Sequence, residues 1–186
     1  MTIQEYVDRG RAAVEAIKDY DQAQVDKLVY EAGKIIYQHA AELAREAVDE
    51  TGLGYYEDKI GKNTDIPAAF WHYLKDKKSV GIISEDKEKG ITEVAHPVGD
   101  IACITPATNP NVPPLGNFMA AAKGKTALLA SPAPPPAPHT PPAHPALAFS
   151  TLPALPPIFL FSSPRLPSSL PLPSSLPSSL SSFSPL

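Results

Sequence analysis

The sequence contains a single cysteine and, in its last third, almost no charge. One thiol, Cys103, excludes an internal disulfide framework. All 20 acidic residues lie in the first 100 positions, and Arg165 is the only basic residue after Lys125. Glycine is absent after Gly124, whereas 17 of the 23 prolines follow Ser131. The chain therefore has two unlike parts, and only the first has the composition of a packed domain.

Other absences bear on partners and location. The formal net charge of −4 comes from interspersed acids and bases, so we expect no binding to nucleic acid or anionic membranes. No charged leader precedes an apolar stretch, and the most apolar window, 146–161, is proline-interrupted and shorter than the roughly 20 residues of a spanning helix. The histidines lack zinc-site spacing, so we expect no metal. A reducing cytoplasm is the expected location.

Helical patterns occupy most of the first 78 residues. Thr2 and Glu5 have the spacing of a capping box, and the helix that they open is expected to end near Asp19. Asp21 can cap a second helix, whose apolar stripe continues to Thr51. The residues expected to stop it are Gly52 and Gly54.

A less regular helical region follows. Residues 55–62 are expected to form a short helical turn. Thr64 or Asp65 can then cap another helix that has Pro67 in its first turn, where a missing N–H costs little. Its expected buried residues are Phe70, Trp71 and Leu74.

The period changes after residue 78. Apolar residues at 80–83 and 91–94 flank a polar turn and predict a β-hairpin. Residues 101–104 form a short apolar run of the kind buried on both faces of a parallel sheet. A helix at about 115–123 and a second strand at 127–130 would complete a βαβ unit, so the predicted fold class is α/β.

The remaining residues, 133–186, have no helical or strand period. They consist of a proline-rich stretch and near-repeats of Pro-Ser-Ser-Leu, which are typical of disordered or polyproline-like sequence. We therefore predict a folded domain at 1–132 and a low-complexity tail at 133–186.

Three glycine motifs and the cysteine suggest sites, but none has the required setting. The glycine spacings do not match a phosphate-binding loop. We interpret Gly52-Leu53-Gly54 as a helix end, Gly61-Lys62 as a loop and Gly124-Lys125-Thr126 as a helix-to-strand turn. Cys103 lies within an apolar run without a nearby base or cation, so a packing role is favoured over a nucleophilic one.

The most informative stretch runs from Ala95 to Pro110. Pro-Val-Gly, an apolar strand and Thr-Pro-Ala-Thr-Asn-Pro resemble the first strand and loop of the nucleotide-binding domain in CoA-acylating aldehyde dehydrogenases. The strand at 127–132 is similar too. Further upstream, similar motifs lie at 50–54, 57–59, 62–63 and 81–86. Together they cover most of residues 1–132, and the resemblance implies that these residues are a partial N-terminal, NAD-binding domain with a Rossmann-like fold.

The resemblance implies particular site residues. Asn109 would correspond to the family asparagine whose amide donates to the oxyanion formed by attack on the aldehyde. The alternative is a loop asparagine that caps a turn. The resemblance also implies cofactor-binding residues: Thr105, Pro106 and Thr108 would lie in the loop between the catalytic and cofactor pockets, and Ser131 and Pro132 would lie at the strand end over which the adenosine half of NAD rests.

The implied activity is oxidation of a short-chain aldehyde to an acyl-CoA. In that reaction a thiolate adds to the carbonyl, hydride leaves to NAD and coenzyme A attacks the thioester. The resemblance stops after Pro132, and the nucleophilic cysteine has no counterpart, so we expect this chain to be inactive. A shifted reading frame or faulty gene model is our hypothesis for the break, and a genuine low-complexity tail is the alternative. The aldehyde, the choice between NAD and NADP, and the oligomeric state, a homo-oligomer included, stay open.

Two other outcomes are consistent with the sequence. The chain could be an interaction protein that binds a full-length subunit, with Pro-x-x-Pro ligands at 132–135 and 142–145. It could also be a fragment whose exposed helix faces and unpaired strand edges lead to aggregation or degradation.

Overall fold

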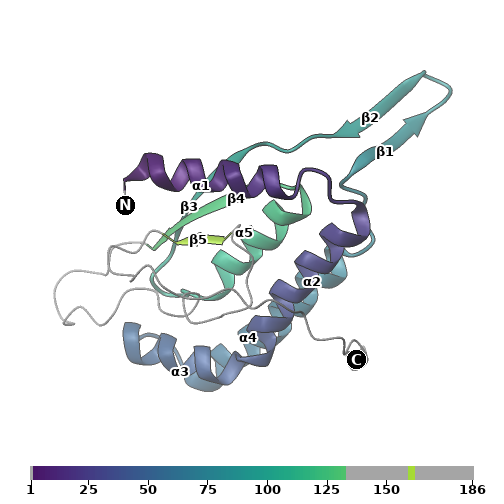
Figure 1. The fold of residues 1–186 in the computed structure, drawn as a ribbon. Coiled ribbons are helices and arrows are strands. Elements are labelled where there is room, and N and C mark those ends of the chain that lie inside the picture. Colours follow the sequence, from purple (N-terminus) through teal and green to yellow (C-terminus); the bar gives the residue numbers. More distant parts are fainter. Residues whose placement is uncertain (1, 133–158, 162–186) are drawn as a thin grey trace.

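The computed structural model describes residues 2–132 and 159–161, which contain five helices and five strands (Figure 1). The helices are α1 (Ile3–Ala16), α2 (Gln22–Gln38), α3 (Ala40–Thr51), α4 (Tyr56–Leu74) and α5 (Val112–Lys123). The strands are β1 (Gly81–Asp86), β2 (Ile91–Ala95), β3 (Asp100–Thr105), β4 (Ala127–Pro132) and β5 (Phe159–Phe161).

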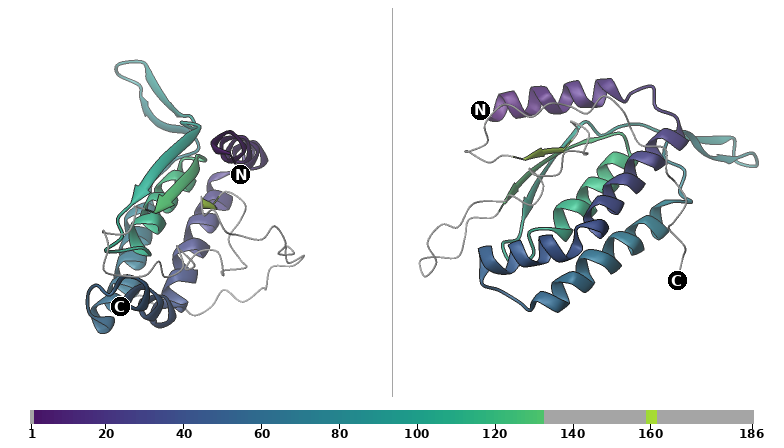
Figure 2. Two further views of the ribbon diagram at one scale, coloured as in Figure 1. Left: turned by 90° about the vertical axis from the view of Figure 1, so that its left-hand side faces the viewer. Right: turned by 60° about the horizontal axis from the view of Figure 1, so that its bottom comes forward.

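A small parallel sheet lies between two helical layers. α1 packs along one face of the sheet and α5 along the other, and α2 and α4 pack against the far side of α5 (Figures 1 and 2). β3 and β4 are parallel and are joined by α5, which confirms the predicted βαβ unit and the α/β class. Within the described part of the chain no helix is long and apolar enough to cross a membrane, and no group of potential metal ligands is found.

The first helix begins as the sequence predicts. The Thr2 hydroxyl accepts from the Glu5 amide at 3.3 Å, and the Glu5 carboxylate accepts from the Thr2 amide at 2.8 Å, which confirms the capping box. Gly10 allows α1 to approach the sheet closely, because a Cβ there would stand 2.8 Å from an oxygen of Asp100.

The predicted long second helix is two helices. Asp21 caps α2 as expected, but the helix ends at Gln38, and α3 begins after His39 (φ −101°, ψ 20°). The apolar stripe continues through the break, so the periodicity does not reveal the change of direction. The break places Ala40 where its carbonyl accepts from the side-chain amide of Asn63 at 3.1 Å. The break at His39 is therefore accompanied by a hydrogen bond between residues distant in sequence, which the local apolar pattern does not reveal.

The region from 55 to 74 departs from the prediction in the opposite way. α4 is one continuous helix with Pro67 inside it, so the separate turn and the cap at Thr64 or Asp65 are wrong, as is the loop at Gly61. The Thr64 hydroxyl donates back to the Gly61 carbonyl at 2.9 Å instead of capping. Pro67 is buried, and its packing offsets the helical hydrogen bond that it cannot donate. The expected buried side is confirmed, with Leu74 in the core and Phe70 and Trp71 packed against it.

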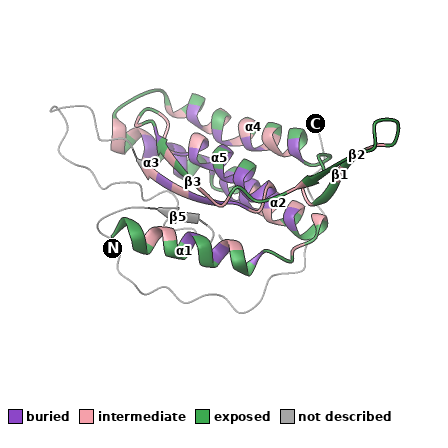
Figure 3. Cartoon of the chain, turned by 90° about the horizontal axis from the view of Figure 1, so that it is seen from above, coloured by how far each residue is buried: buried purple, intermediate pink, exposed green. Residues whose placement is uncertain are grey.

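The predicted β-hairpin is confirmed, and it projects from the body of the molecule (Figure 1). β1 and β2 pair antiparallel and are mostly exposed (Figure 3). Even the large apolar side chains Ile82, Ile91 and Val94 are about half exposed.

The prediction that residues 101–104 are buried on both faces is wrong. β3 is an edge strand of the described sheet, and Ile104 is 79% exposed. β4 is the central strand, with Leu128 and Ala130 buried. α5 begins at Val112, three residues before the predicted start.

One part of the 133–186 prediction is corrected. Residues 159–161, for which we expected no strand, form β5 and pair parallel with β4. The other residues of that segment lie outside the described part of the chain.

The core is formed mainly by α5, α2 and the sheet (Figure 3). Leu115, Phe118 and Met119 of α5 are essentially inaccessible, as are Val29 and Ile36 of α2. An ion pair also joins α5 to α2, with Lys123 and Asp26 as its partners. The α5 helix that connects the two strands is thereby fixed between the sheet and the helical layer.

Candidate functional site

The carboxyl ends of β3 and β4 meet at one edge of the sheet. In the parallel register, Thr105 lies opposite Pro132 and Ile104 lies opposite Ser131. Thr105 is buried, and its hydroxyl donates to the Ser131 carbonyl at 3.4 Å. Three of the residues singled out in the sequence, distant along the chain, are thus adjacent at the edge where parallel sheets bind ligands.

The loop that leaves β3 carries the other residues. Pro106 and Thr108 are exposed, and Asn109 is partly exposed. The backbone amide of Asn109 donates to the Pro106 carbonyl at 3.4 Å, so the turn is closed by its main chain. Among the described residues, the Asn109 side-chain amide makes no hydrogen bond, whereas the turn-capping interpretation would require one.

Two buried polar side chains anchor this loop, one from α4 and one from the residue that precedes α5. The Lys59 ammonium of α4 donates to the Thr108 carbonyl at 3.2 Å. The Asn111 amide, at the start of α5, donates to the Leu43 carbonyl of α3 at 3.0 Å. Burial, and then the positive charge of Lys62, lower the pKa of Lys59.

The sequence alone predicts no role for Lys59 or Asn111. Lys59 belongs to a motif that carries the family resemblance, at 57–59, and this is the signal that could have drawn attention to it. Asn111 had no such signal, because its contact with α3 spans 68 positions along the chain.

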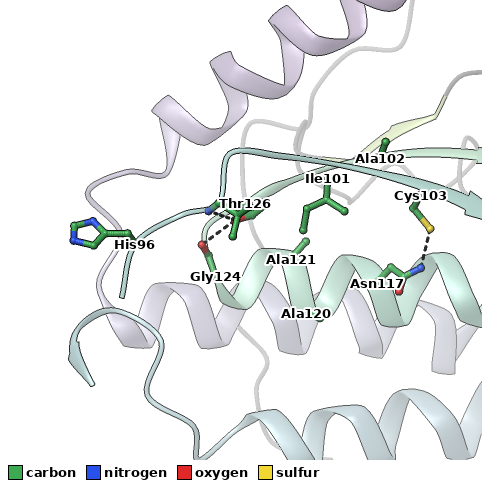
Figure 4. A pocket seen from close by; sticks show the side chains of 10 residues that line it. His96, Ile101, Ala102, Cys103, Asn117, Ala120, Ala121, Gly124 and Thr126 are labelled. Atoms are coloured by element: carbon green, nitrogen blue, oxygen red, sulfur yellow. Dashed lines mark hydrogen bonds between the residues drawn. The ribbon is translucent and has the colours of Figure 1, made fainter. Parts of the chain in front are cut away.

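A separate open hollow of about 390 Å³ lies between β3 and α5 (Figure 4). Its walls are mainly apolar and include Ile101 and Ala121. Cys103 points toward it, with its sulfur accepting from the Asn117 side chain at 2.8 Å (Figure 4). Cys103 is half-buried and packs against the core, which agrees with the packing role expected from the sequence. None of the predicted site residues lines this hollow.

Two of the three glycine interpretations are confirmed. Gly52 ends α3 in the left-handed conformation, with φ +64°. Gly124 caps α5 and leads through Lys125 into β4, as a helix-to-strand turn.

A βαβ unit with helices on both faces, and with polar groups gathered at the carboxyl edge of its strands, defines an α/β domain of the nucleotide-binding class. No family model matches the chain. Over 134 residues the chain is 43% identical to the acetylating succinate-semialdehyde dehydrogenase of Clostridium kluyveri, covering 72% of this chain and 30% of that protein. Over 131 residues it is 39% identical to a sulfoacetaldehyde dehydrogenase of Acholeplasma sp, covering 69% and 27%.

Solved structures agree with these relatives. The crystal structure of an acetylating aldehyde dehydrogenase from Geobacillus thermoglucosidasius matches with a TM-score of 0.68 and 36% identity, covering 70% of this chain and 29% of that one. At 24% identity, and so as likenesses of fold alone, a Rhodopseudomonas palustris propionaldehyde dehydrogenase contains CoA and an engineered glycolyl-CoA reductase contains NADP+.

The homologues of this chain are therefore acylating aldehyde dehydrogenases, and the described fold is that of the nucleotide-binding domain of the family. They match about 70% of the chain, as the motifs indicate. The chain spans 30% and 27% of the length of these two relatives.

Proposed function

We propose that residues 1–132 are the N-terminal, NAD-binding part of a CoA-acylating aldehyde dehydrogenase in which Asn109 is an oxyanion donor. The observation that carries the proposal is the state of the Asn109 side chain. Its amide has no hydrogen-bond partner among the described residues, although the loop around it is anchored by Lys59 and Asn111. A side-chain amide that lies on an anchored loop and makes no hydrogen bond within the described fold is available to a ligand.

The chemistry of this amide suits the reaction of the family. When a thiolate adds to an aldehyde, negative charge develops on the carbonyl oxygen. A donor fixed in advance stabilises that charge without reorganising during the reaction. Asn109 can donate to this oxygen but cannot generate the charge, because an amide is not a nucleophile.

The position of the strand ends supports a dinucleotide site, because parallel sheets bind ligands at the carboxyl edge of their strands. Thr105 and Pro132 lie opposite each other at the carboxyl edge, and the loop that carries Asn109 follows Thr105 directly in the chain. We propose that Ser131 and Pro132 support the adenosine half, and that Thr105, Pro106 and Thr108 lie between the catalytic and cofactor pockets. When bound, NAD supplies the hydride acceptor. Aldehyde and coenzyme A would be the substrates, and the proposed location is the cytoplasm, with a homo-oligomer as the proposed assembly.

The 186 residues alone are proposed to be inactive. Their only thiol, Cys103, packs within β3, and its hydrogen-bond partner is the Asn117 amide rather than a general base. We propose that a shifted reading frame introduced the sequence at 133–186. Translation of the other two frames downstream of the codon for Pro132 should then restore a charged helix and a later cysteine motif, and their absence from both frames would exclude a frameshift.

A chimaera tests the function directly. Residues 1–132 would replace the matched segment of the Clostridium kluyveri enzyme, and NADH formation from succinate semialdehyde and CoA would be measured. Turnover by the chimaera, together with none by the 186-residue chain, is the expected result. A folded chimaera that binds NAD but forms no NADH would refute the proposal.

A second candidate is a non-catalytic interaction protein that binds a full-length subunit. It is favoured by the half-exposed apolar side chains of the hairpin, Ile82, Ile91 and Val94. Co-elution of this chain with a full-length relative on gel filtration, lost on changing these three residues to serine, would support it. Independent elution would exclude it.

A further inference from the structure

Lys59 is a buried cation for which the proposed reaction gives no role. It lies near the start of α4 and is only 7% exposed, which is unusual for a lysine. Gly54, with φ +80°, leaves room for it, since a Cβ there would stand 3.2 Å from Cε of Lys59. The glycine and the lysine, both within motifs of the family resemblance, therefore act together to direct an ammonium at the loop after β3.

The target of this ammonium is one end of a single peptide unit. The Thr108 carbonyl accepts from Lys59 at 3.2 Å. This carbonyl and the backbone amide of Asn109 belong to the same planar peptide group. The Asn109 amide donates to the Pro106 carbonyl at 3.4 Å. With both ends bonded, the plane is fixed, and so is the direction in which the Asn109 Cα leaves it.

A second anchor lies two residues further on. Asn111 is 2% exposed, and its side-chain amide donates to the Leu43 carbonyl of α3. Its own carbonyl accepts from the Leu115 amide at 3.4 Å in the first turn of α5. Asn109 is thus held between one peptide plane fixed by α4 and one side chain fixed by α3.

We infer that Lys59 and Asn111 are positioning residues. By fixing the backbone on both sides of Asn109, they orient its side-chain amide toward the reacting oxygen. The inference rests on the proposed role of Asn109. A donor contributes most to charge stabilisation when its orientation is set before the reaction, and small misplacements of such groups are costly. The helices α3 and α4 would therefore act on the chemistry through the loop, without contacting the substrate.

Lys59 and Asn111 together are called the clamp of the Asn109 loop. Hydrogen exchange of the backbone amides in the full 186-residue chain tests this clamp without any turnover. The variant Lys59→Met keeps the length of the side chain but removes the donor. In this variant the backbone amide of Asn109 should exchange on the order of tenfold faster. Lys59→Arg should restore most of the protection. Lys62→Met is the matched control, because Lys62 is an exposed lysine one turn away on the same helix and should leave the Asn109 amide unchanged. Amides of β4 should be unaffected in all three variants.

Several outcomes would overturn the inference. Unchanged Asn109 exchange in Lys59→Met would do so, as would an equal effect of Lys62→Met. If Lys59→Met lowers protection throughout β4, the role of Lys59 is structural rather than positioning, and Asn111→Ser then decides for the second anchor. There the Asn109 and Leu115 amides should lose protection while β4 keeps it.

A kinetic readout separates this inference from the proposed function. In the chimaera, Lys59→Met should lower kcat about tenfold with little change in KM for the aldehyde, and should add little to Asn109→Ala. An inactive chimaera whose clamp variants still change Asn109 exchange would refute the oxyanion role and keep the clamp. Full kcat in Lys59→Met with faster exchange would refute the orienting role.

Discussion

The Asn109 loop and the β1–β2 hairpin are both exposed segments, but different parts of the chain hold them. The loop depends on hydrogen bonds to residues 49 and 68 positions away, in α4 and α3. The hairpin is held by its own antiparallel ladder and by Asp86, whose carboxylate accepts from the Lys89 amide within the turn. The helical layer reaches only the base of the hairpin, where the Gln22 side chain of α2 accepts from the Ser79 and Val80 amides. The candidate site therefore depends on the helical layer, whereas the strands and turn of the hairpin are held mainly by local contacts.

The largest expected effect comes from removing core volume behind the loop. Phe118 is inaccessible at the centre of α5, and Phe118→Ala should lower the free energy of unfolding by about 3–5 kcal/mol. Ile82→Ala in the hairpin, where the side chain is 54% exposed, should change it by about 0.5 kcal/mol or less. Urea unfolding followed by circular dichroism measures both. Similar costs at the two positions would mean that the hairpin is part of the cooperative core, contrary to the comparison.

The second effect concerns chemistry rather than stability. In the chimaera, Asn109→Ala should lower kcat by about 10²–10³-fold, which is the usual cost of removing an oxyanion donor. Asp86→Ala in the hairpin turn is the control and should leave kcat unchanged. Steady-state kinetics with the aldehyde varied provides the measurement. A loss below about threefold for Asn109→Ala would remove Asn109 from the proposed site.

The same contrast explains what could be predicted from the sequence. The capping box at Thr2, the hairpin and the βαβ unit follow from local signals, and all three are confirmed. The break at His39 and the continuous helix through Pro67 could not be predicted, because both go with packing between segments distant in sequence. The exposure of Ile104 could not be predicted for a related reason, because a run of apolar residues does not reveal which strand lies at a sheet edge.

The candidate site divides in the same way. Asn109 and the strand-end residues were found through a local motif, and the register brings Thr105, Ser131 and Pro132 together. The anchors Lys59 and Asn111 were assigned no role, because a lysine or asparagine gives no local indication that it is buried against a backbone carbonyl. Local motifs therefore indicate the proposed oxyanion donor more readily than the residues that anchor its loop.

A smaller effect is expected from a carboxylate in the helical layer. Burial, and then the charges of Glu42 and Glu50, raise the pKa of Glu46 above its ordinary value of 4.5. The folded chain therefore binds a proton more tightly than the unfolded chain, and its stability falls as the pH rises from 4.5 through the raised pKa. Glu46→Gln should stabilise the chain at pH 7 and lose that advantage below pH 4.5. Thermal unfolding at the two pH values measures this, with the exposed Glu93→Gln as control, and an equal gain at both would exclude the mechanism.

The smallest effect on stability is expected in the hairpin turn. Its pH dependence has the opposite sign to that of Glu46. Hydrogen bonds from the Lys89 backbone amide and then from its side chain lower the pKa of Asp86 below its ordinary value of 3.8. The folded turn therefore favours the ionised carboxylate, and its stabilisation is complete above pH 3.8 and is lost as the pH falls through the lowered pKa. In NMR spectra the Glu88 and Lys89 amide signals should shift over that acid range while the Asn109 signal stays in place, and Asp86→Asn should abolish the transition. If the Asn109 signal moved together with the hairpin signals, the two segments would be coupled, and the independence of the hairpin from the loop would be wrong.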